Sequence, residues 1–284
     1  MRNKMSPKFF TIIMIAAFML IGCSTKQEGS TTTSTEQSKE KTITEQSEKR
    51  VIGIIGAMIE EVEILRDKME IESTETIAGM EFYKGTLDGE NIVLVQSGVG
   101  KVNAAACTQA LVDHFGVDYL INSGVAGGLT TDVTIGDIVI STDAVQHDFD
   151  ITAFGEKPGV IARMDTSYFK ADEKLIQLAQ SATRGLNEDI NVVQGRIASG
   201  DQFIASPEQK DWITENFSPY AVEMEGAAIA HVAHLNEVPF VIIRSISDDA
   251  SGEAEVKYED FVKTAAENAS KMIEEMIKAA DENL

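Results

Sequence analysis

Three carboxylates stand out as candidates for chemistry because each one follows an apolar run that predicts a buried strand. Glu61 lies in Gly-Ala-Met-Ile-Glu-Glu-Val-Glu, Glu225 in Val-Glu-Met-Glu-Gly-Ala-Ala and Asp248 in Val-Ile-Ile-Arg-Ser-Ile-Ser-Asp-Asp. Carboxyl groups gathered at one site can donate and accept protons, and burial raises their pKa values toward neutrality. These three residues are therefore the candidate catalytic acids and bases.

A purely local structural role is open for each of the three acids. Glu61 and Glu225 both stand where a helix is predicted to begin, and the helix macrodipole favours a negative charge in the first turn. Asp248 shares its segment with Arg244, so an ion pair at the end of the strand would also account for it. Local sequence leaves both interpretations in place.

The elements that must position these acids alternate between strands and helices. Short apolar runs predict the strands, and apolar residues at helical spacing predict the helices between them. The predicted strands cover 51–55, 91–96, 118–122, 137–141, 192–199, 220–222 and 240–245, and the predicted helices cover about 59–69, 101–115, 225–236 and 258–280. This order predicts an α/β fold with a largely parallel sheet covered on both faces.

Polar clusters follow the carboxyl ends of several predicted strands, which is where open α/β sheets bind ligands. The clusters are Glu60/Glu61, Ser97, Glu223/Glu225 and Ser247/Asp248. Their convergence predicts one site at this edge of the sheet. Two glycine-rich turns, 97–100 and 124–128, also follow strands, but neither matches a dinucleotide or nucleoside-triphosphate motif. They fit phosphate-binding turns and plain tight turns equally well.

The charge of the chain limits its partners. The net charge is −22, and residues 1–50 carry eight Lys/Arg against five Asp/Glu, so the remainder is more acidic still. An acidic body repels nucleic acid and anionic lipid surfaces, which favours a small neutral or cationic substrate, although acidity also serves solubility. Cys107 lies in an alanine-rich helical segment and is expected to be a buried apolar residue. No Cys/His cluster has zinc spacing, so we expect no metal.

Residues 1–50 differ from the rest of the chain. Basic residues precede an apolar run at 9–21, which is too short to span a bilayer and predicts a signal peptide. The run ends in Leu-Ile-Gly-Cys, which resembles the bacterial lipoprotein box, so we expect cleavage after residue 22 and a lipid on Cys23. An ordinary signal peptide or an uncleaved anchor is the alternative. Residues 23–50 are polar and predict a disordered tether, and the expected location is the outer face of the bacterial cell membrane.

Residues 51–284 resemble the 5′-methylthioadenosine/S-adenosylhomocysteine nucleosidases of the nucleoside phosphorylase superfamily. The resemblance rests on Gly-Ala-Met-x-x-Glu at 56–61, Ser-Gly-Asp-x-Phe-Ile at 199–204 and Val-Glu-Met-Glu at 222–225, with further matching segments at 97–105, 122–129, 136–140, 152–155 and 244–248. It implies a three-layer α/β/α sandwich with a mixed, partly closed central sheet. It also implies a homodimer that needs no cofactor.

The resemblance implies hydrolysis of the N-glycosidic bond of 5′-methylthioadenosine and S-adenosylhomocysteine, and also of 5′-deoxyadenosine, in methionine salvage and recycling of adenosylmethionine by-products. Asp248 would protonate adenine N7, Glu61 would activate the attacking water and Glu225 would bind the ribose hydroxyls. Phe203 would stack on adenine, and the backbone of Ile204 would read its edge. The positions that carry over as substrate-binding residues are Ala57, Met58, Ser97, Phe203, Ile204, Met224, Arg244, Ser247 and Tyr258.

Three features depart from the family pattern. Val125 stands where the Gly-Ser-Ala-Gly-Gly turn has a serine, the segment after Gly155 does not match the loop that reaches the partner subunit, and a lipoprotein leader comes first. Two other functions stay open. A purine nucleoside phosphorylase needs cations around phosphate, and the site segments offer only Lys101 and Arg244. A nucleoside-binding lipoprotein without activity would have no need for the three acids.

Overall fold

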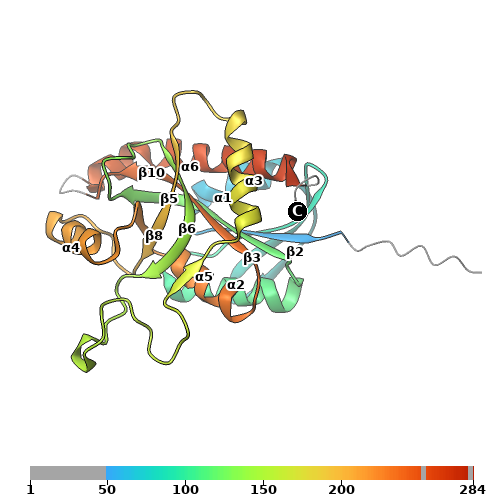
Figure 1. The fold of residues 1–284 in the computed structure, drawn as a ribbon. Helices are drawn as coiled ribbons and strands as arrows, with labels where there is room; N and C mark the ends of the chain where they lie inside the picture. The colour runs from blue at the N-terminus through green and yellow to red at the C-terminus, as the bar shows by residue number, and fades with distance from the viewer. Residues whose placement is uncertain (1–48, 251–253, 281–283) are drawn as a thin grey trace, which may run out of the picture. The chain divides into compact units, whose positions relative to one another are not determined.

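A ten-stranded mixed sheet forms the centre of the computed structural model, which describes residues 49–250, 254–280 and 284 (Figure 1). Neighbouring strands run in the order β10-β6-β8-β9-β5-β1-β4-β3-β2, and β7 pairs with β6. The strands are β1 (Val51–Gly56), β2 (Glu70–Ile77), β3 (Met80–Leu87), β4 (Glu90–Gln96), β5 (Tyr119–Gly128), β6 (Ile138–Gln146), β7 (Tyr168–Lys170), β8 (Val192–Ser199), β9 (Ala221–Glu223) and β10 (Phe240–Asp248).

Helices cover both faces of this sheet. The described residues form α1 (Ile59–Lys68), α2 (Lys101–Phe115), α3 (Glu173–Ala182), α4 (Pro207–Phe217), α5 (Gly226–Leu235) and α6 (Ala254–Lys278), with short 3-10 turns η1 (Thr152–Phe154) and η2 (Thr183–Gly185). Helices α1 and α3 pack against α6 on one face, whereas α2 and α5 pack against each other on the opposite face (Figure 1). The result is the three-layer α/β/α sandwich that the sequence predicts.

The sheet closes on itself at one side because β10 pairs with both β6 and β5. Strands β5, β10, β6, β8 and β9 thereby form a ring, while β1, β4, β3 and β2 extend from it as an open sheet. This arrangement confirms the mixed, partly closed sheet. The expectation of a largely parallel sheet is wrong, because antiparallel pairs such as β2–β3, β3–β4 and β10–β6 are as frequent among the described residues as parallel ones.

The core strands are apolar on both faces, as expected for strands between two helical layers. In β1 every residue after Val51 is buried, and β10 is buried throughout. Strands β1, β5 and β10 run parallel, so their carboxyl ends meet at one edge. The polar residues that follow these strands are brought together there, and this edge holds the candidate site.

Residues 1–48, which include the predicted signal peptide, Cys23 and nearly all of the tether, lie outside the described residues. Within the described part of the chain, no helix has the length and hydropathy needed to cross a membrane.

Candidate active site

A cavity of about 230 Å³ opens at the carboxyl ends of β1, β5 and β10. Nine of the twelve predicted catalytic and binding residues line it. They are Ala57, Met58, Glu61, Phe203, Met224, Glu225, Ser247, Asp248 and Tyr258, and the cavity is completed by Val99, Val125, Ala126, Gly127, Val222 and Glu223. The remaining three predicted residues, Ser97, Ile204 and Arg244, lie beside the cavity and do not line it. The convergence that the sequence predicts is therefore present in the fold.

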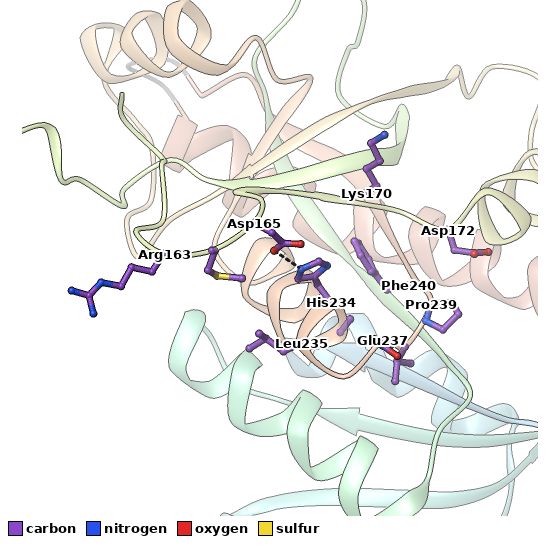
Figure 2. Close-up of a pocket in the computed structure, with 12 residues that line it drawn as sticks. Arg163, Asp165, Lys170, Asp172, His234, Leu235, Glu237, Pro239 and Phe240 are labelled. Carbon is purple, nitrogen blue, oxygen red and sulfur yellow. Dashed lines mark hydrogen bonds and ion pairs between the residues drawn. The ribbon is translucent and has the colours of Figure 1, made fainter. Parts of the chain in front are cut away.

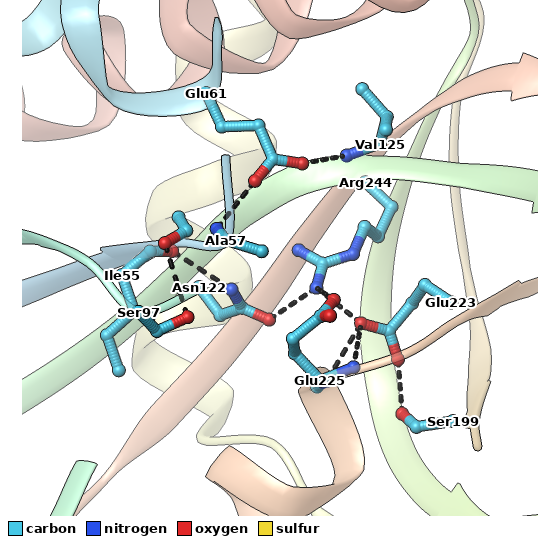
Figure 3. Close-up of polar contacts among 12 residues, drawn as sticks. Ile55, Ala57, Glu61, Ser97, Asn122, Val125, Ser199, Glu223, Glu225 and Arg244 are labelled. Atoms are coloured by element: carbon cyan, nitrogen blue, oxygen red, sulfur yellow. Dashed lines mark hydrogen bonds and ion pairs between the residues drawn. The ribbon is translucent and has the colours of Figure 1, made fainter. Parts of the chain in front are cut away.

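Glu61 is held almost entirely by the backbone. It lies in the first turn of α1, and its Oε2 accepts the N–H groups of Ala57 at 2.6 Å and Met58 at 3.0 Å. Its Oε1 accepts the N–H of Val125 on β5 at 3.1 Å (Figure 3). These bonds join α1 to two strands and fix the carboxylate at the wall of the cavity. Burial raises the pKa of Glu61, although Arg244 and the three N–H groups oppose the shift.

A glycine makes room for this carboxylate. A Cβ atom on Gly124 would lie 2.7 Å from Oε1 of Glu61 and 3.0 Å from Nη1 of Arg244. Real Cβ contacts are almost never this short, so any larger residue would displace either the acid or the guanidinium. The prediction of a turn at 124–128 is wrong, because this glycine-rich segment is the end of strand β5, and Gly124 has a packing role next to the site.

Arg244 carries the positive charge at the centre of the acidic cluster. It is almost completely buried on β10, and its Nη2 donates to Asn122 Oδ1 at 2.6 Å and to Glu223 Oε2 (Figure 3). The carboxylate of Glu225 lies 4.0 Å from the same nitrogen. Burial alone would lower the pKa of Arg244, but the surrounding glutamates raise it, so the guanidinium stays charged.

Glu225 stands at the N-terminus of α5 and faces the cavity. Its Oε1 accepts the N–H of Gly100 at 2.7 Å, which ties it to the turn before α2. Burial, and next to it the negative charge of Glu223, raise the pKa of Glu225 to about 8. The cluster of Glu61, Glu223, Glu225 and Arg244 contains three acids and one base, so it is net negative once more than one of the acids is ionised, and it then favours a ligand that is or becomes cationic.

Asp248 ends β10 on the other side of the cavity. Its Oδ1 accepts the N–H of Ala250 at 2.8 Å, and its Oδ2 accepts the hydroxyl of Ser247 at 3.0 Å. Burial raises the pKa of Asp248, and these two hydrogen bonds oppose the shift. A buried carboxyl group with a raised pKa can hold a proton and act as a general acid.

Two aromatic rings border the mouth of the cavity. Phe203 and Tyr258 meet edge to face with their centroids 5.7 Å apart, and the hydroxyl of Tyr258 donates to Met58 Sδ at 3.0 Å. Burial and the nearby Glu61 raise the pKa of Tyr258 to about 12, so its hydroxyl stays neutral. Phe203 is 43% exposed, which leaves a ring face free for a flat apolar ligand. Ile204 follows Phe203 and lines a small adjoining cavity of about 30 Å³.

Ser97 has a structural position in this fold. It is buried after β4, and its hydroxyl donates to the carbonyl of Gly98 at 2.9 Å, with Gly56 O at 3.4 Å. Its backbone N–H also donates to Gly56 O at 2.8 Å. Ser97 therefore joins the turns after β1 and β4 that border the cavity.

Glu223 belongs to a predicted polar cluster but is not among the predicted site residues. It lines the cavity, and its carboxylate accepts hydrogen bonds from Ser199, Arg244 and two backbone N–H groups. Asn122, which holds Arg244, was not singled out either. The local signal for Glu223 is its position two residues before Glu225. Its side-chain partners, however, lie on β8 and β10, and only the fold brings these strands close to Glu223.

A second and larger cavity, of about 620 Å³, lies elsewhere and lacks this convergence (Figure 2). It is lined by residues of the 163–172 segment, the end of α5 and the start of β10, where His234 and Asp165 pair at 3.3 Å. Phe240 borders it and Asp248 borders the acidic cavity, so the two cavities lie at opposite ends of β10, roughly 25 Å apart along the strand. The polar side chains that line this second cavity are largely exposed. Its larger volume alone therefore does not make it the candidate active site.

The titratable side chains that line the candidate site are the carboxyl groups and the hydroxyl of Tyr258. No group of metal-ligating side chains suited to an ion occurs among residues 49–250, 254–280 and 284. Cys107 is fully buried in α2, as expected, and burial raises the pKa of its thiol to about 12. A buried, protonated thiol is inert as a nucleophile.

Comparisons with known proteins agree with this fold. The family model described as "Phosphorylase superfamily" matches residues 51–278. The chain is 48% identical over 227 residues to a 5′-methylthioadenosine/S-adenosylhomocysteine nucleosidase of Anoxybacillus flavithermus, covering 80% of this chain and 97% of that protein.

Solved structures of two bacterial nucleosidases superpose on most of the chain. The Neisseria meningitidis enzyme in complex with methylthio-immucillin-A has a TM-score of 0.78 at 42% identity, covering 81% of this chain and 99% of that one. The Colwellia psychrerythraea enzyme in complex with adenine also has a TM-score of 0.78, at 41% identity, covering 81% and 95%. The predicted fold is thereby confirmed.

Proposed function

Because this chain belongs to the 5′-methylthioadenosine/S-adenosylhomocysteine nucleosidase family of the phosphorylase superfamily, we propose that it hydrolyses the N-glycosidic bond of these two thionucleosides. The products are adenine and the 5-substituted ribose. One observation carries the proposal: three buried carboxyl groups with raised pKa values line a single cavity of about 230 Å³. 5′-Deoxyadenosine, which has the same adenine and ribose, is a further expected substrate.

Asp248 is the proposed general acid. Adenine leaves poorly as an anion, so the bond between ribose C1′ and adenine N9 breaks readily only when N7 receives a proton. The raised pKa of Asp248 supports this role, because the group must carry a proton near neutral pH. The Ser247 hydroxyl and the Ala250 N–H fix the orientation of the carboxyl group. As the C–N bond breaks, its electron pair moves to the adenine, and the proton of Asp248 moves to N7.

Glu61 is the proposed base for the attacking water. The water oxygen bonds to C1′ and its proton passes to Glu61. Its three hydrogen bonds from backbone N–H groups support the assignment, because a base must be held in one orientation to direct water at a carbon. Arg244, beside Glu61, keeps the local charge balanced, and Ser97 shapes the turn that borders the cavity.

Glu225 is the proposed partner of the ribose hydroxyls, and its ionised form, whose share increases as the pH rises toward about 8, stabilises the cationic sugar of the transition state. Met224 and Met58 supply apolar walls, with Ala57 beside them. Phe203 stacks on the adenine, and the backbone of Ile204 hydrogen-bonds to the edge of the adenine ring. Tyr258 borders the ribose. Stacking is supported by the exposed ring face of Phe203 at the mouth of the cavity.

The test of this proposal is the release of free adenine from 5′-methylthioadenosine by the full chain in buffer without phosphate. Adenine and methylthioribose should appear in equal amounts, and added phosphate should leave the rate unchanged. Strict dependence on phosphate would show that the chain is a phosphorylase. Binding of the nucleoside with no turnover would show that it is a binding protein.

We also propose that the chain works as a homodimer. Large apolar side chains that a monomer leaves in water support the proposal, because Val102, Phe154 and Leu235 are 79%, 86% and 64% exposed. Light scattering on the purified chain should give twice the mass of 30.9 kDa. A monomer at all concentrations that show activity would contradict it.

We further propose that the chain is exported, cleaved after residue 22 and held at the outer face of the cell membrane by a lipid on Cys23. The lipoprotein-box pattern at residues 20–23 supports this location. Two acyl chains hold a protein durably on a membrane. Cys23→Ser should abolish labelling by a fatty-acid probe and leave an unprocessed precursor, whereas undiminished labelling would contradict the anchor.

A further inference from the structure

Glu223 accepts more hydrogen bonds than the proposed reaction explains. Its Oε1 accepts the hydroxyl of Ser199, and its Oε2 accepts the N–H groups of Glu225 at 3.1 Å and Gly226 at 2.8 Å together with Nη2 of Arg244 (Figure 3). Both carboxylate oxygens are therefore engaged by the protein. These four hydrogen bonds, one of them from the charged guanidinium of Arg244, hold the carboxylate against the protein, although Glu223 borders the cavity.

The hydrogen bonds of Glu223 determine the positions of two other groups. The backbone N–H bonds fix the turn at which β9 becomes α5, and Glu225 projects from this turn. The ion pair holds the guanidinium of Arg244 at Glu223, so that Glu225 lies 4.0 Å from the same nitrogen and outside hydrogen-bond distance. A shift of roughly 1 Å would bring Arg244 into direct contact with Glu225. The position of this one cation therefore decides whether the Glu225 carboxylate is free to face the cavity.

We infer that Glu223 is a positioning residue that holds Arg244 away from Glu225, so that the Glu225 carboxylate stays available to the ribose. The inference rests on the proposed function, because it assigns Glu225 the ribose hydroxyls. Glu223 acts only through Arg244 and through the strand-to-helix turn. Without its negative charge, the guanidinium moves to Glu225 and occupies the carboxylate that the substrate needs.

Several charged or titratable groups surround Glu225. They are Glu61 on α1, Glu223 on β9, Arg244 and Asp248 on β10, and Tyr258 on α6, and the Gly100 N–H before α2 completes the set. Glu223 is the acid that adds most to the raised pKa of Glu225, after burial. Removing the charge of Glu223 and moving Arg244 closer both favour the ionised form of Glu225. The two effects therefore shift the titration of Glu225 in the same direction, toward lower pH.

The decisive variant is Glu223→Gln in the full chain. A glutamine can keep its carbonyl oxygen toward the N–H groups of Glu225, Gly226 and Arg244, and it can donate to Ser199, so the shape is preserved and only the charge is lost. The KM for 5′-methylthioadenosine should rise about 10- to 100-fold, the range expected when a hydrogen bond to a charged group is lost. The acidic limb of the kcat/KM profile should move at least about one pH unit lower.

Glu90→Gln is the matched control, because Glu90 is also a buried acid paired with an arginine, at 3.1 Å from Arg50 and outside the site. It should leave the acidic limb and the KM of the unaltered chain in place. A Glu223→Gln variant with the wild-type KM and an unmoved acidic limb would overturn the inference.

Glu223→Asp keeps the charge but withdraws it from Arg244 by one methylene, so KM should rise and the acidic limb should move less far toward low pH than in Glu223→Gln. If Glu223→Gln does not fold, a wild-type KM in Glu223→Asp overturns the inference instead. Failure of the unaltered chain to release adenine would overturn the proposed function, which distinguishes the two.

Discussion

Asp248→Asn separates proton transfer from binding because of how the carboxyl group is held. Asn is nearly isosteric with Asp, and its carbonyl oxygen can accept the Ala250 N–H as Oδ1 does now at 2.8 Å. Its amide nitrogen would then occupy the position of Oδ2, 3.0 Å from the Ser247 hydroxyl, which can accept instead of donating. The same amide can also donate a hydrogen bond to adenine N7, as a protonated carboxyl group does. Binding of the nucleoside should therefore change little.

Catalysis should fall steeply because an amide cannot give up a proton to the leaving group. Loss of a general acid typically lowers the rate ~10²–10⁴-fold, which corresponds to about 3–5.5 kcal/mol of transition-state stabilisation. The upper part of this range is expected, because Asp248 is buried to 2% exposure and bulk water has little access to replace it as the acid. We therefore expect kcat to fall at least about 10³-fold while KM stays within about threefold of the wild-type value.

Steady-state release of adenine from 5′-methylthioadenosine measures kcat and KM together, and equilibrium binding of adenine checks that the cavity is intact. Asp249→Asn is the control, because the Asp249 side chain is 47% exposed, pairs with Lys257 at 2.7 Å and is not among the residues that line the cavity. It should keep turnover within about twofold of wild type. Near-normal turnover by Asp248→Asn, or a loss of equal size in Asp249→Asn, would show that Asp248 is not the acid.

Three further predictions concern the acidic cluster. Glu225→Gln should raise KM and lower kcat together, since the charge of Glu225 serves both bound substrate and transition state, and a change in kcat alone would contradict its contact with ribose. Gly124→Ala should lower kcat/KM at least about tenfold, because its Cβ would lie 2.7 Å from Glu61 Oε1. Gly116→Ala should lower stability, because φ is +59°, but should leave kcat/KM unchanged, because nothing lies within 4 Å of the added Cβ. The raised pKa of Glu225, about 8 against a usual 4.5, means that the folded state binds more protons than the unfolded state between these values, so this residue costs stability as pH rises through that window. The melting temperature of Glu225→Gln, relative to wild type, should therefore increase from pH 5 to pH 8, and a constant difference would contradict the pKa shift.

The parts of the fold that the sequence predicts are those with strong apolar patterns. Strands β1 and β4 and helix α2 appear close to their predicted bounds, because their sequences are unbroken apolar or alanine-rich runs. Strands β5 and β10 begin near the predicted residues but extend beyond the predicted ends, to Gly128 and Asp248. Strand β2 (Glu70–Ile77) was not predicted, since none of its residues is buried and its sequence is mostly polar. It exists because it pairs with β3, and such pairing depends on a neighbour rather than on its own residues.

Two helices were missed although local signals were present. Asp172 caps α3 by accepting two backbone N–H groups, and Ser206 with Pro207 begins α4. These are the cap residues that favour a helix start. The antiparallel strand pairs could not be predicted from local sequence, because the direction of a strand depends on how the connections before and after it run in space.

The site residues also divide into those that have a local sequence signal and those that do not. Glu61, Glu225 and Asp248 were identified because each follows a strand in a recognisable motif, and all three line one cavity. The close relation of Glu223 to Arg244 could not be predicted, because it joins strands whose order in the sheet places them together. The catalytic roles of Glu61, Glu225 and Asp248 are predictions that the variants test.

The three hydrogen bonds to Glu61 make the position of the base tolerant of mutation. All the donors are main-chain amides, those of Ala57, Met58 and Val125, and every amino acid except proline carries this group. Valine at 125, in place of the serine usual in the family, therefore removes a hydroxyl but keeps the hydrogen bond that holds the base. Substitutions other than proline at these three positions can therefore change the lining of the cavity without removing the hydrogen bonds that hold Glu61. The orientation of the proposed base is determined by the backbone.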